Sequence, residues 1–381
     1  MKKVLATILA LVMALSVTTM AWADDVAKIG GTGYATLQEA VDAATNGQTT
    51  IVLQSNVVLT ASLNVAAGKT VTLDLNSCKI TADMNGPHMI CNAGNLTITD
   101  SSENKTGEIA KIGAETNFGY VIENHGTMTL DRCKISSTSV KSSAIENGWY
   151  TASANTAGTS CTMTIQNAEV VSVNAVGGLY TVKNDDYGVM VINGGVFTNG
   201  VAGAGAVLNW NDLTINGGTF TGASAVRTLK SGSSDFETGK SQIKNGTFNG
   251  GIDTLDGYKT GITIAVTGGT FSTDVTEYLA EGKILQKNGD TYTAVTNSGI
   301  TSGTYTAKPT VPDGYKVVEN TDGTFTVEKV GGYYYYQPTT DTKTTDTKGS
   351  PKTFDAGIAL YVGMALTSAA GVAFVGKKRE D

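Results

Sequence analysis

Short runs of alternating apolar and polar residues recur through the middle of the chain, each followed by a glycine-rich bend and a second short run. The stretch Leu213–Phe220 reads Leu-Thr-Ile-Asn-Gly-Gly-Thr-Phe. In an extended strand its leucine and isoleucine lie on one side and the threonine between them lies on the other. The Asn-Gly-Gly step suits a bend, because both residue types adopt positive φ at little cost. The pattern predicts two short strands whose apolar side chains, including the final phenylalanine, face one interior.

Similar stretches repeat at Val189–Phe197, Ser241–Phe248 and Ile264–Phe271, and weaker copies precede them. The recurring aliphatic positions are Leu53, Leu75, Ile98, Leu130, Ile165, Ile192, Ile215, Ile243 and Val266, with spacings that never fall below 22 residues. One unit cannot bury its apolar side alone, so the units must stack. We predict an all-β solenoid of parallel strands over residues 24–271, with threonine and asparagine outside and a phenylalanine ladder inside, made of Phe197, Phe220, Phe248 and Phe271. An antiparallel sandwich is the alternative, but the constant place of the motif in each unit favours the solenoid.

An amphipathic segment precedes the repeats. Thr36–Ala44 carries its apolar residues on one helical face, and Thr36 and Glu39 can form a capping box. We expect this helix to lie over the first coil. Together with Gly68–Leu75 it resembles the N-terminal end of pectin-lyase-fold surface proteins from gut Firmicutes, and the resemblance covers most of residues 33–271. It implies a right-handed parallel β-helix, in a fold that also carries pectate lyases and polygalacturonases, so the fold alone does not decide the function.

A different pattern follows the last repeat. Thr273–Ala280 reads as a short helix, and Asn288-Gly289 reads as the turn of a hairpin. Residues 303–327 look like a diverged second copy of this unit. We predict C-terminal helix and β-hairpin capping units over residues 272–330, followed by a tyrosine- and threonine-rich spacer over residues 331–349.

Both ends of the chain carry signals for export and anchoring. Residues 1–23 combine two lysines, an apolar run and the small residues Ala21 and Ala23, as in a cleaved signal peptide. An N-terminal membrane anchor is the alternative. Residues 356–375 hold no charge and are long enough to cross ~30 Å of hydrocarbon as a transmembrane helix, and a basic tail follows at once. A buried helix of a soluble domain is the alternative for this segment.

The five residues before the apolar segment are Ser350, Pro351, Lys352, Thr353 and Phe354. With the helix and the basic tail they resemble the sortase sorting signal of Gram-positive surface proteins, Leu-Pro-x-Thr-Gly. The resemblance implies that a sortase cysteine attacks the Thr353 carbonyl, although serine and phenylalanine replace the family's leucine and glycine. It implies signal peptidase and sortase as partners and a place on the extracellular surface, attached to peptidoglycan. A simple C-terminal membrane anchor within residues 350–381 is the alternative.

Charge narrows the range of partners. Residues 24–353 hold 22 of the 27 basic and 31 of the 34 acidic residues, a net charge of −9. Arginine is confined to Arg132, Arg227 and Arg379. An acidic body that is poor in arginine argues against a nucleic-acid partner, which needs phosphate-neutralising charge. The 2 histidines leave little room for a histidine-based metal or catalytic site, so we predict no metal and no cofactor.

Fragments of the polygalacturonase motif series are present in the wrong order. They are Asn124-His125-Gly126, Asn184-Asp185-Asp186 and Arg227 followed by Lys230. Asp185 and Asp186 are the best candidates for paired carboxylates. We interpret Asp131-Arg132 as a surface pair, and His88 and His125 as turn or ladder residues. We therefore predict no catalytic residues.

Two further groups bear on function. An insertion at residues 141–160 contains Trp149 and Tyr150, which are candidate contacts for a sugar or a protein, unless Trp149 packs onto its own coil. Four cysteines, Cys78, Cys91, Cys133 and Cys161, either form disulfides in one of three pairings or stay as buried thiols. We predict a non-enzymatic adhesin or display structure that binds a glycan or protein. The alternative is a surface polysaccharide lyase or glycoside hydrolase.

Overall fold

The computed structural model describes residues 25–331, with gaps at 87, 114–116, 118, 139–140, 151–153, 173–179 and 231–238. The predicted signal peptide, the spacer after Gly331, the sorting motif and the C-terminal apolar segment lie outside the described residues. Within the described part of the chain, no helix is long and apolar enough to cross a membrane.

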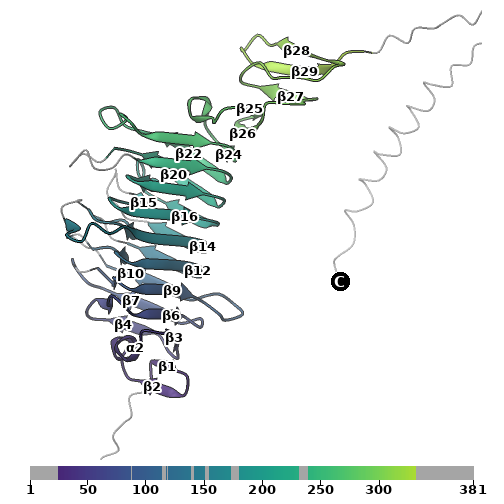
Figure 1. The fold of residues 1–381 in the computed structure, drawn as a ribbon. Coiled ribbons are helices and arrows are strands. Elements are labelled where there is room, and N and C mark those ends of the chain that lie inside the picture. The colour runs from purple at the N-terminus through teal and green to yellow at the C-terminus, as the bar shows by residue number, and fades with distance from the viewer. Residues whose placement is uncertain are drawn as a thin grey trace, which may run out of the picture. The chain divides into compact units, whose positions relative to one another are not determined.

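The described strands wind into stacked coils, and each coil contributes to three faces, which we name A, B and C (Figure 1). Face A contains β3 (Gln48–Leu53), β6 (Thr70–Asp74), β9 (Asn95–Thr99), the first parts of β12 (Thr127–Ser137) and β14 (Cys161–Ser172), β16 (Gly188–Ile192), β19 (Asp212–Ile215), β21 (Lys240–Ile243) and β23 (Thr263–Val266). Face B contains β4 (Val57–Leu59), β7 (Lys79–Ala82), β10 (Glu108–Lys111), the second parts of β12 and β14, β17 (Gly195–Asn199), the first parts of β20 (Thr219–Thr228) and β22 (Thr247–Asp253), and β24 (Thr270–Phe271). Face C contains β5 (Leu63–Val65), β8 (Ile90–Asn92), β11 (Ile122–Asn124), β13 (Ile145–Asn147), β15 (Tyr180–Asn184), β18 (Gly205–Asn209) and the second parts of β20 and β22.

Strands on each face pair in parallel with the equivalent strand of the next coil, as predicted. Ile98 lies opposite Leu130, and Leu130 lies opposite Ile165. The start of the predicted series was wrong by two residues, because Ile98 lies opposite Leu73 and Leu73 lies opposite Ile51. Leu53 and Leu75 also point inward. In a strand, residues two apart share a face, so the alternation alone could not choose between the two registers.

The prediction of two strands per unit was also wrong, since face C supplies a third. Several of its strands are only three residues long, and β11 and β13 both read Ile-Glu-Asn. Such a strand is too short to show the alternation that marks a strand in a sequence.

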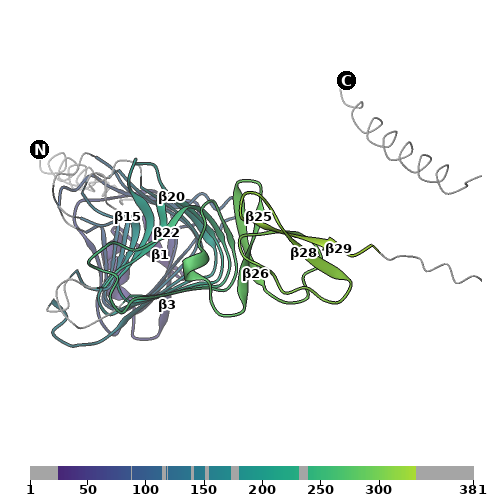
Figure 2. The same ribbon diagram turned by 90° about the horizontal axis from the view of Figure 1, so that it is seen from above.

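The phenylalanine ladder is confirmed. Phe197, Phe220, Phe248 and Phe271 are buried, and their rings stack with centroids 4.9, 5.0 and 4.9 Å apart and interplanar angles of 5° to 8°. Their spacing follows the ~4.8 Å distance between neighbouring strands. Seen from above, the coils lie over one another (Figure 2).

A second ladder runs inside the turn that follows face C. The prediction that asparagines lie outside was wrong there, since five of them are buried: Asn92, Asn124, Asn147, Asn184 and Asn209. The first four each donate from Nδ2 to Oδ1 of the next, over 2.7 to 2.8 Å, and Asn209 donates to Ser241 over 3.0 Å. An amide carries two donors and one acceptor group, so a column of amides satisfies itself away from water. An outer ladder also exists, in which Asn216 donates to Asn193 over 2.7 Å.

The N-terminal end of the stack is covered as predicted. Helix α2 (Leu37–Ala43) begins with the Thr36–Glu39 capping box and buries Leu37, Ala40 and Val41. Gln38 exchanges two hydrogen bonds with the backbone of Asn64 on β5, at 2.8 and 3.1 Å. Strand β1 (Ala27–Ile29) pairs antiparallel with β3 and with β2 (Thr32–Tyr34). These contacts satisfy backbone groups that an uncovered edge strand leaves unpaired.

Antiparallel hairpins follow the last coil. β24 pairs with β26 (Thr291–Thr296), which forms the predicted hairpin with β25 (Lys283–Asn288). The helix expected over Thr273–Ala280 is wrong in extent, since only the 3-10 helix η2 (Thr276–Tyr278) forms. The second copy comprises β27 (Gly303–Tyr305), β28 (Tyr315–Glu319) and β29 (Phe325–Lys329). Its Tyr305–Phe325 pairing repeats that of Phe271 with Tyr292, which supports the predicted duplication.

Candidate functional site

The asparagine ladder sets the positions of the polar residues around face C. Because side chains alternate along a strand, the residue before each buried asparagine points outward. Three such residues lie in register on adjacent strands, with Glu123 opposite Glu146 and Glu146 opposite Lys183. The turns after the asparagines add His125, Trp149, Asp185, Tyr187 and Trp210. We name this outward set and its immediate neighbours the face C site.

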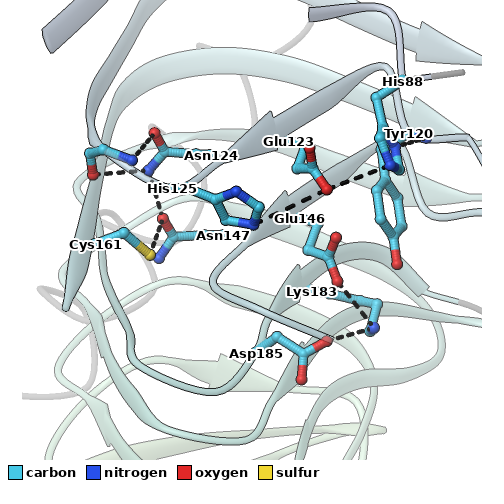
Figure 3. A network of polar contacts seen from close by, with 11 residues as sticks. His88, Tyr120, Glu123, Asn124, His125, Glu146, Asn147, Cys161, Lys183 and Asp185 are labelled. Atoms are coloured by element: carbon cyan, nitrogen blue, oxygen red, sulfur yellow. Dashed lines mark hydrogen bonds and ion pairs between the residues drawn. The ribbon is translucent and has the colours of Figure 1, made fainter. Parts of the chain in front are cut away.

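Both histidines of the chain meet at Glu123 (Figure 3). Oε1 of Glu123 lies 3.3 Å from Nε2 of His88 and 3.9 Å from Nε2 of His125. The Tyr120 backbone N–H donates to Nδ1 of His88 over 3.1 Å. Nδ1 is therefore an acceptor, which places the His88 proton on Nε2, where it faces the Glu123 carboxylate. The interpretation of the histidines as turn or ladder residues missed this arrangement.

Aromatic rings surround the two histidines. His125 stacks on Trp149 with centroids 4.4 Å apart, and the edge of Tyr187 meets Trp149 at 6.1 Å. His88 stacks on Tyr120 at 5.0 Å. Trp149 thus packs against the coils on either side of its own. Tyr187 has a φ of 61°, an uncommon left-handed backbone for a bulky residue, and such strain gathers at functional sites.

The aromatic side chains continue along the stack. Trp210 meets Tyr258 edge to face at 6.1 Å, and it packs against a cluster made of Tyr180, Leu208 and Leu229. Tyr150 and Tyr258 are exposed, by 70% and 41%. Both tryptophans within the described residues therefore lie beside face C.

A buried group of charges lies next to Glu123. Nζ of Lys183 is 2.5 Å from Asp185 Oδ2 and 3.6 Å from Glu146 Oε1 (Figure 3). Burial raises the pKa of Glu146 to about 8, because the attraction of Lys183 does not outweigh the loss of solvent and the repulsion of Asp185. Burial lowers the pKa of Lys183, but Asp185 and Glu146 raise it further, so the amine stays charged.

The Tyr120 ring closes this group on one side. Its pKa is raised by burial and by the charge of Glu146, with which its hydroxyl shares a hydrogen bond. Lys183 Nζ lies 5.9 Å from the centroid of Tyr120 and 5.1 Å from that of Tyr150. Near neutral pH the site thus combines a protonated acid at Glu146 with the charged amine of Lys183. This is a pairing of groups with separated pKa values, as acid–base chemistry requires.

The polygalacturonase-like fragments do not assemble as that motif. Asn124 and Asn184 are ladder residues. Arg227 stands on a later coil, where its guanidinium binds Asp253 at 2.6 and 2.8 Å. Asp185 belongs to the face C site. Asp186 joins it through its backbone, whose carbonyl accepts the N–H of Trp149 over 3.0 Å.

Glu123, Glu146 and Lys183 were missed by the sequence analysis. A signal for them exists in the repeated tripeptides Ile122–Asn124 and Ile145–Asn147, followed by Val-Lys-Asn at 182–184. The repetition of asparagine at the third place marks the ladder, and the middle residue is then the outward one.

The four cysteines, all within the described residues, are free thiols. Burial raises the pKa of Cys91 to about 11 and that of Cys133 to about 12, so these thiols stay protonated. Cys78 and Cys133 occupy equivalent places two coils apart, as their flanking residues Ile80 and Ile135 both pair with the intervening coil. No cluster of three or more metal-ligating side chains is found among the described residues.

Comparisons with protein-family models, curated proteins and solved structures find no match for the chain.

Proposed function

We propose that this protein is an exported surface protein whose solenoid, a right-handed parallel β-helix of the pectin-lyase type, binds a glycan at the face C site as an adhesin or display structure. The observation that carries the proposal is the row of rings after the ladder asparagines. His125, Trp149, Tyr187 and Trp210 follow Asn124, Asn147, Asn184 and Asn209 in turn. The first three rings lie 4.4 and 6.1 Å apart between centroids, and rings on successive coils suit a chain of sugar units that runs along the stack.

Polar groups beside the rings supply the hydrogen bonds that sugar hydroxyl groups need. Glu123 is part-exposed and accepts hydrogen bonds, while Trp149 and Tyr150 offer apolar ring surface with a polar edge. Tyr150 is 70% exposed, so it is available to a ligand without rearrangement of the core.

The chain ends support a surface location. Residues 1–23 have the composition of a signal peptide, and residues 350–381 combine a sorting-like motif, an apolar segment and a basic tail. On this proposal a sortase joins Thr353 to peptidoglycan, or residues 356–375 anchor the protein in the membrane. Cell fractionation tests the sortase step, because Thr353→Ala must lower the share of protein in the wall fraction, and unchanged wall attachment contradicts it.

A glycan array with the purified solenoid tests the binding proposal. We expect the wild type to retain a defined group of glycans, and the double variant Trp149→Ala/Tyr150→Ala to lose at least tenfold in affinity for them. Val58→Ser is the matched control, since Val58 is an exposed apolar residue on face B. Equal binding by the double variant and the control would remove the face C site from the proposal.

The second candidate function is cleavage of a polysaccharide, as a lyase or glycoside hydrolase. It is favoured by the carboxyl groups of Glu123, Glu146 and Asp185, which gather on one face and include an acid that holds its proton near neutral pH. Release of reducing ends or unsaturated products from a polysaccharide panel, abolished by Glu146→Gln, would establish this function. If the wild type binds glycans but shows no such activity, the enzyme proposal is contradicted and the adhesin proposal stands.

A further inference from the structure

A pocket of about 200 Å³ opens at the bend between faces A and B, apart from the face C site. Its walls include Lys105, Arg132, Lys134, Asn167, Ala168 and Glu169. Among them, Lys105 belongs to the loop between β9 and β10. Three cationic side chains and one anionic side chain line the pocket, and the carboxylates of Asp131 and Glu108 contact two of the cations, in a body whose net charge is −9.

Two of these cations stand on strained backbone. Lys105 has a φ of 52° and Arg132 has a φ of 51°, in the left-handed region that costs energy for residues with a Cβ. Only five non-glycine residues of the described chain have positive φ, so finding two in one pocket wall is a concentration of strain. Strain of this kind points to a functional constraint.

A bulge places Arg132 in the pocket wall. Along β12 and β14, Asp131 lies opposite Asn167 and Cys133 lies opposite Ala168, which leaves Arg132 without a partner. One coil further on, Ala168 lies opposite Gly195, whose φ is 112°, so a glycine takes the positive-φ position in the bend of that coil. A glycine serves the bend, and the arginine is therefore not required by the backbone.

Neighbouring side chains hold the cations in place. Nε of Arg132 donates to Asp131 over 2.8 Å, and its Nη2 donates to Thr99 over 3.3 Å. Nζ of Lys134 lies 3.2 Å from Glu169 and 3.9 Å from Glu108. Both basic side chains remain accessible, with 47% and 40% exposed. Lys105 is tied through Nζ to the carbonyl of Ser102.

We infer that this pocket binds an oxyanion, a sulfate ester or a carboxylate, carried on a ligand the size of one sugar unit. Arginine and lysine donors suit such groups, because charge-assisted hydrogen bonds to oxyanions are stronger than neutral ones. The volume admits a single sugar ring rather than an extended chain. The site is separate from face C and does not depend on the proposed function.

Saturation-transfer NMR on the purified full-length protein, with glucose 6-sulfate, glucuronate and glucose as probes, tests the inference. We expect one or both acidic sugars to bind and glucose not to bind. The acidic sugar that gives the larger signal identifies the oxyanion. Absence of signal from both acidic sugars would overturn the inference.

Variants separate a defined site from general attraction to positive charge. Arg132→Gly puts a glycine at this positive φ, as the bend of a later coil does, so it should fold, and a thermal melt checks this. It should lower affinity for the acidic sugar at least fivefold, and Lys105→Gln should act in the same direction. Lys240→Gln removes an exposed cation on face A and should leave binding unchanged. Retained binding in Arg132→Gly, or an equal loss in Lys240→Gln, would contradict the pocket as the site.

Discussion

Glu146 and Lys183 lie opposite one another on neighbouring coils, with 3.6 Å between the Glu146 Oε1 and Lys183 Nζ atoms. The glutamate is 2% exposed, and the lysine side chain is 13% exposed. Asp185 shares the same ammonium group, so one cation serves two carboxyl groups. This imbalance keeps a proton on Glu146 near neutral pH and makes the stability of this region depend on pH.

Glu146→Gln should remove part of the pH dependence of stability. The pKa of this carboxyl is about 8 in the folded chain, above the ordinary value of about 4.3. A carboxyl whose pKa is raised in the folded state stabilises that state at pH values below its ordinary pKa. This stabilisation is lost as the pH rises toward the pKa of the folded state. The wild type should therefore lose stability between about pH 4.5 and pH 8, and the glutamine variant should lose less.

Thermal melts of both proteins at several pH values in this range measure the difference. Asp256→Asn is the control, because Asp256 is an exposed carboxyl whose loss should leave the slope unchanged. Parallel pH profiles for wild type and Glu146→Gln would show that Glu146 is already ionised in the folded chain.

Lys183→Met should destabilise the fold strongly. The variant leaves the buried carboxylate of Asp185 without its cation, and loss of one partner from a buried ion pair costs about 3–5 kcal/mol. Lys316→Met offers a surface comparison, since Lys316 pairs with Glu328 at 2.9 Å and both are exposed. That pair should contribute about 0–1 kcal/mol. Chemical denaturation at neutral pH measures both, and similar values would contradict the buried character of the cluster.

Asn147→Ala should interrupt the inner asparagine ladder. The variant leaves the Asn124 donor and the Asn184 acceptor without their partner, and each buried unsatisfied group costs about 1–3 kcal/mol. Asn216→Ala breaks a hydrogen bond of the same kind, 2.7 Å long, on the exposed outer ladder. Water can replace that bond, so this variant should lose well under half as much in denaturant unfolding. Equal losses would mean that burial does not govern the inner ladder.

Phe220→Ala should open a cavity in the middle of the phenylalanine column. Phe220 stacks on Phe197 and Phe248 and is fully buried, so truncation should cost about 3–5 kcal/mol, whereas Phe220→Leu should cost less. Val196→Ala, at a 45% exposed neighbour on β17, should have little effect. Unfolding curves for the three variants test the order, and a small effect of Phe220→Ala would show that the coils relax to fill the space.

Much of the architecture could be predicted because its signals are local. Alternation and the Asn-Gly-Gly bends predicted the parallel stack and the Phe220 column, and Thr36 with Glu39 predicted the first helix. The register of the first coils could not be predicted, because Leu73 and Leu75 point to the same interior. Face C was missed, since strands such as Ile122–Asn124 are too short to show a period.

The candidate site was predicted only in part. Trp149, Tyr150 and Asp185 were identified because aromatic and acidic residues in a loop are noticeable by themselves. Glu123 could be recognised only from the structure, in which both His88 and His125 lie near its carboxylate. His88 is 35 positions away in the sequence and His125 is 2 positions away. The pKa of Glu146 is shifted by burial beside Lys183, Asp185 and Tyr120, which belong to other coils, and no local pattern contains this arrangement.

By itself, the sequence determined that the chain stacks repeated β units, that their phenylalanines form a column and that a capped helix begins the fold. These properties follow from residues close together in the chain and are repeated in each copy. Only the tertiary structure decided which coil faces which, where the asparagine ladder runs, and which charges share a buried space. Those outcomes depend on the registry between coils, which joins residues such as Glu146 and Lys183 that have no local relationship.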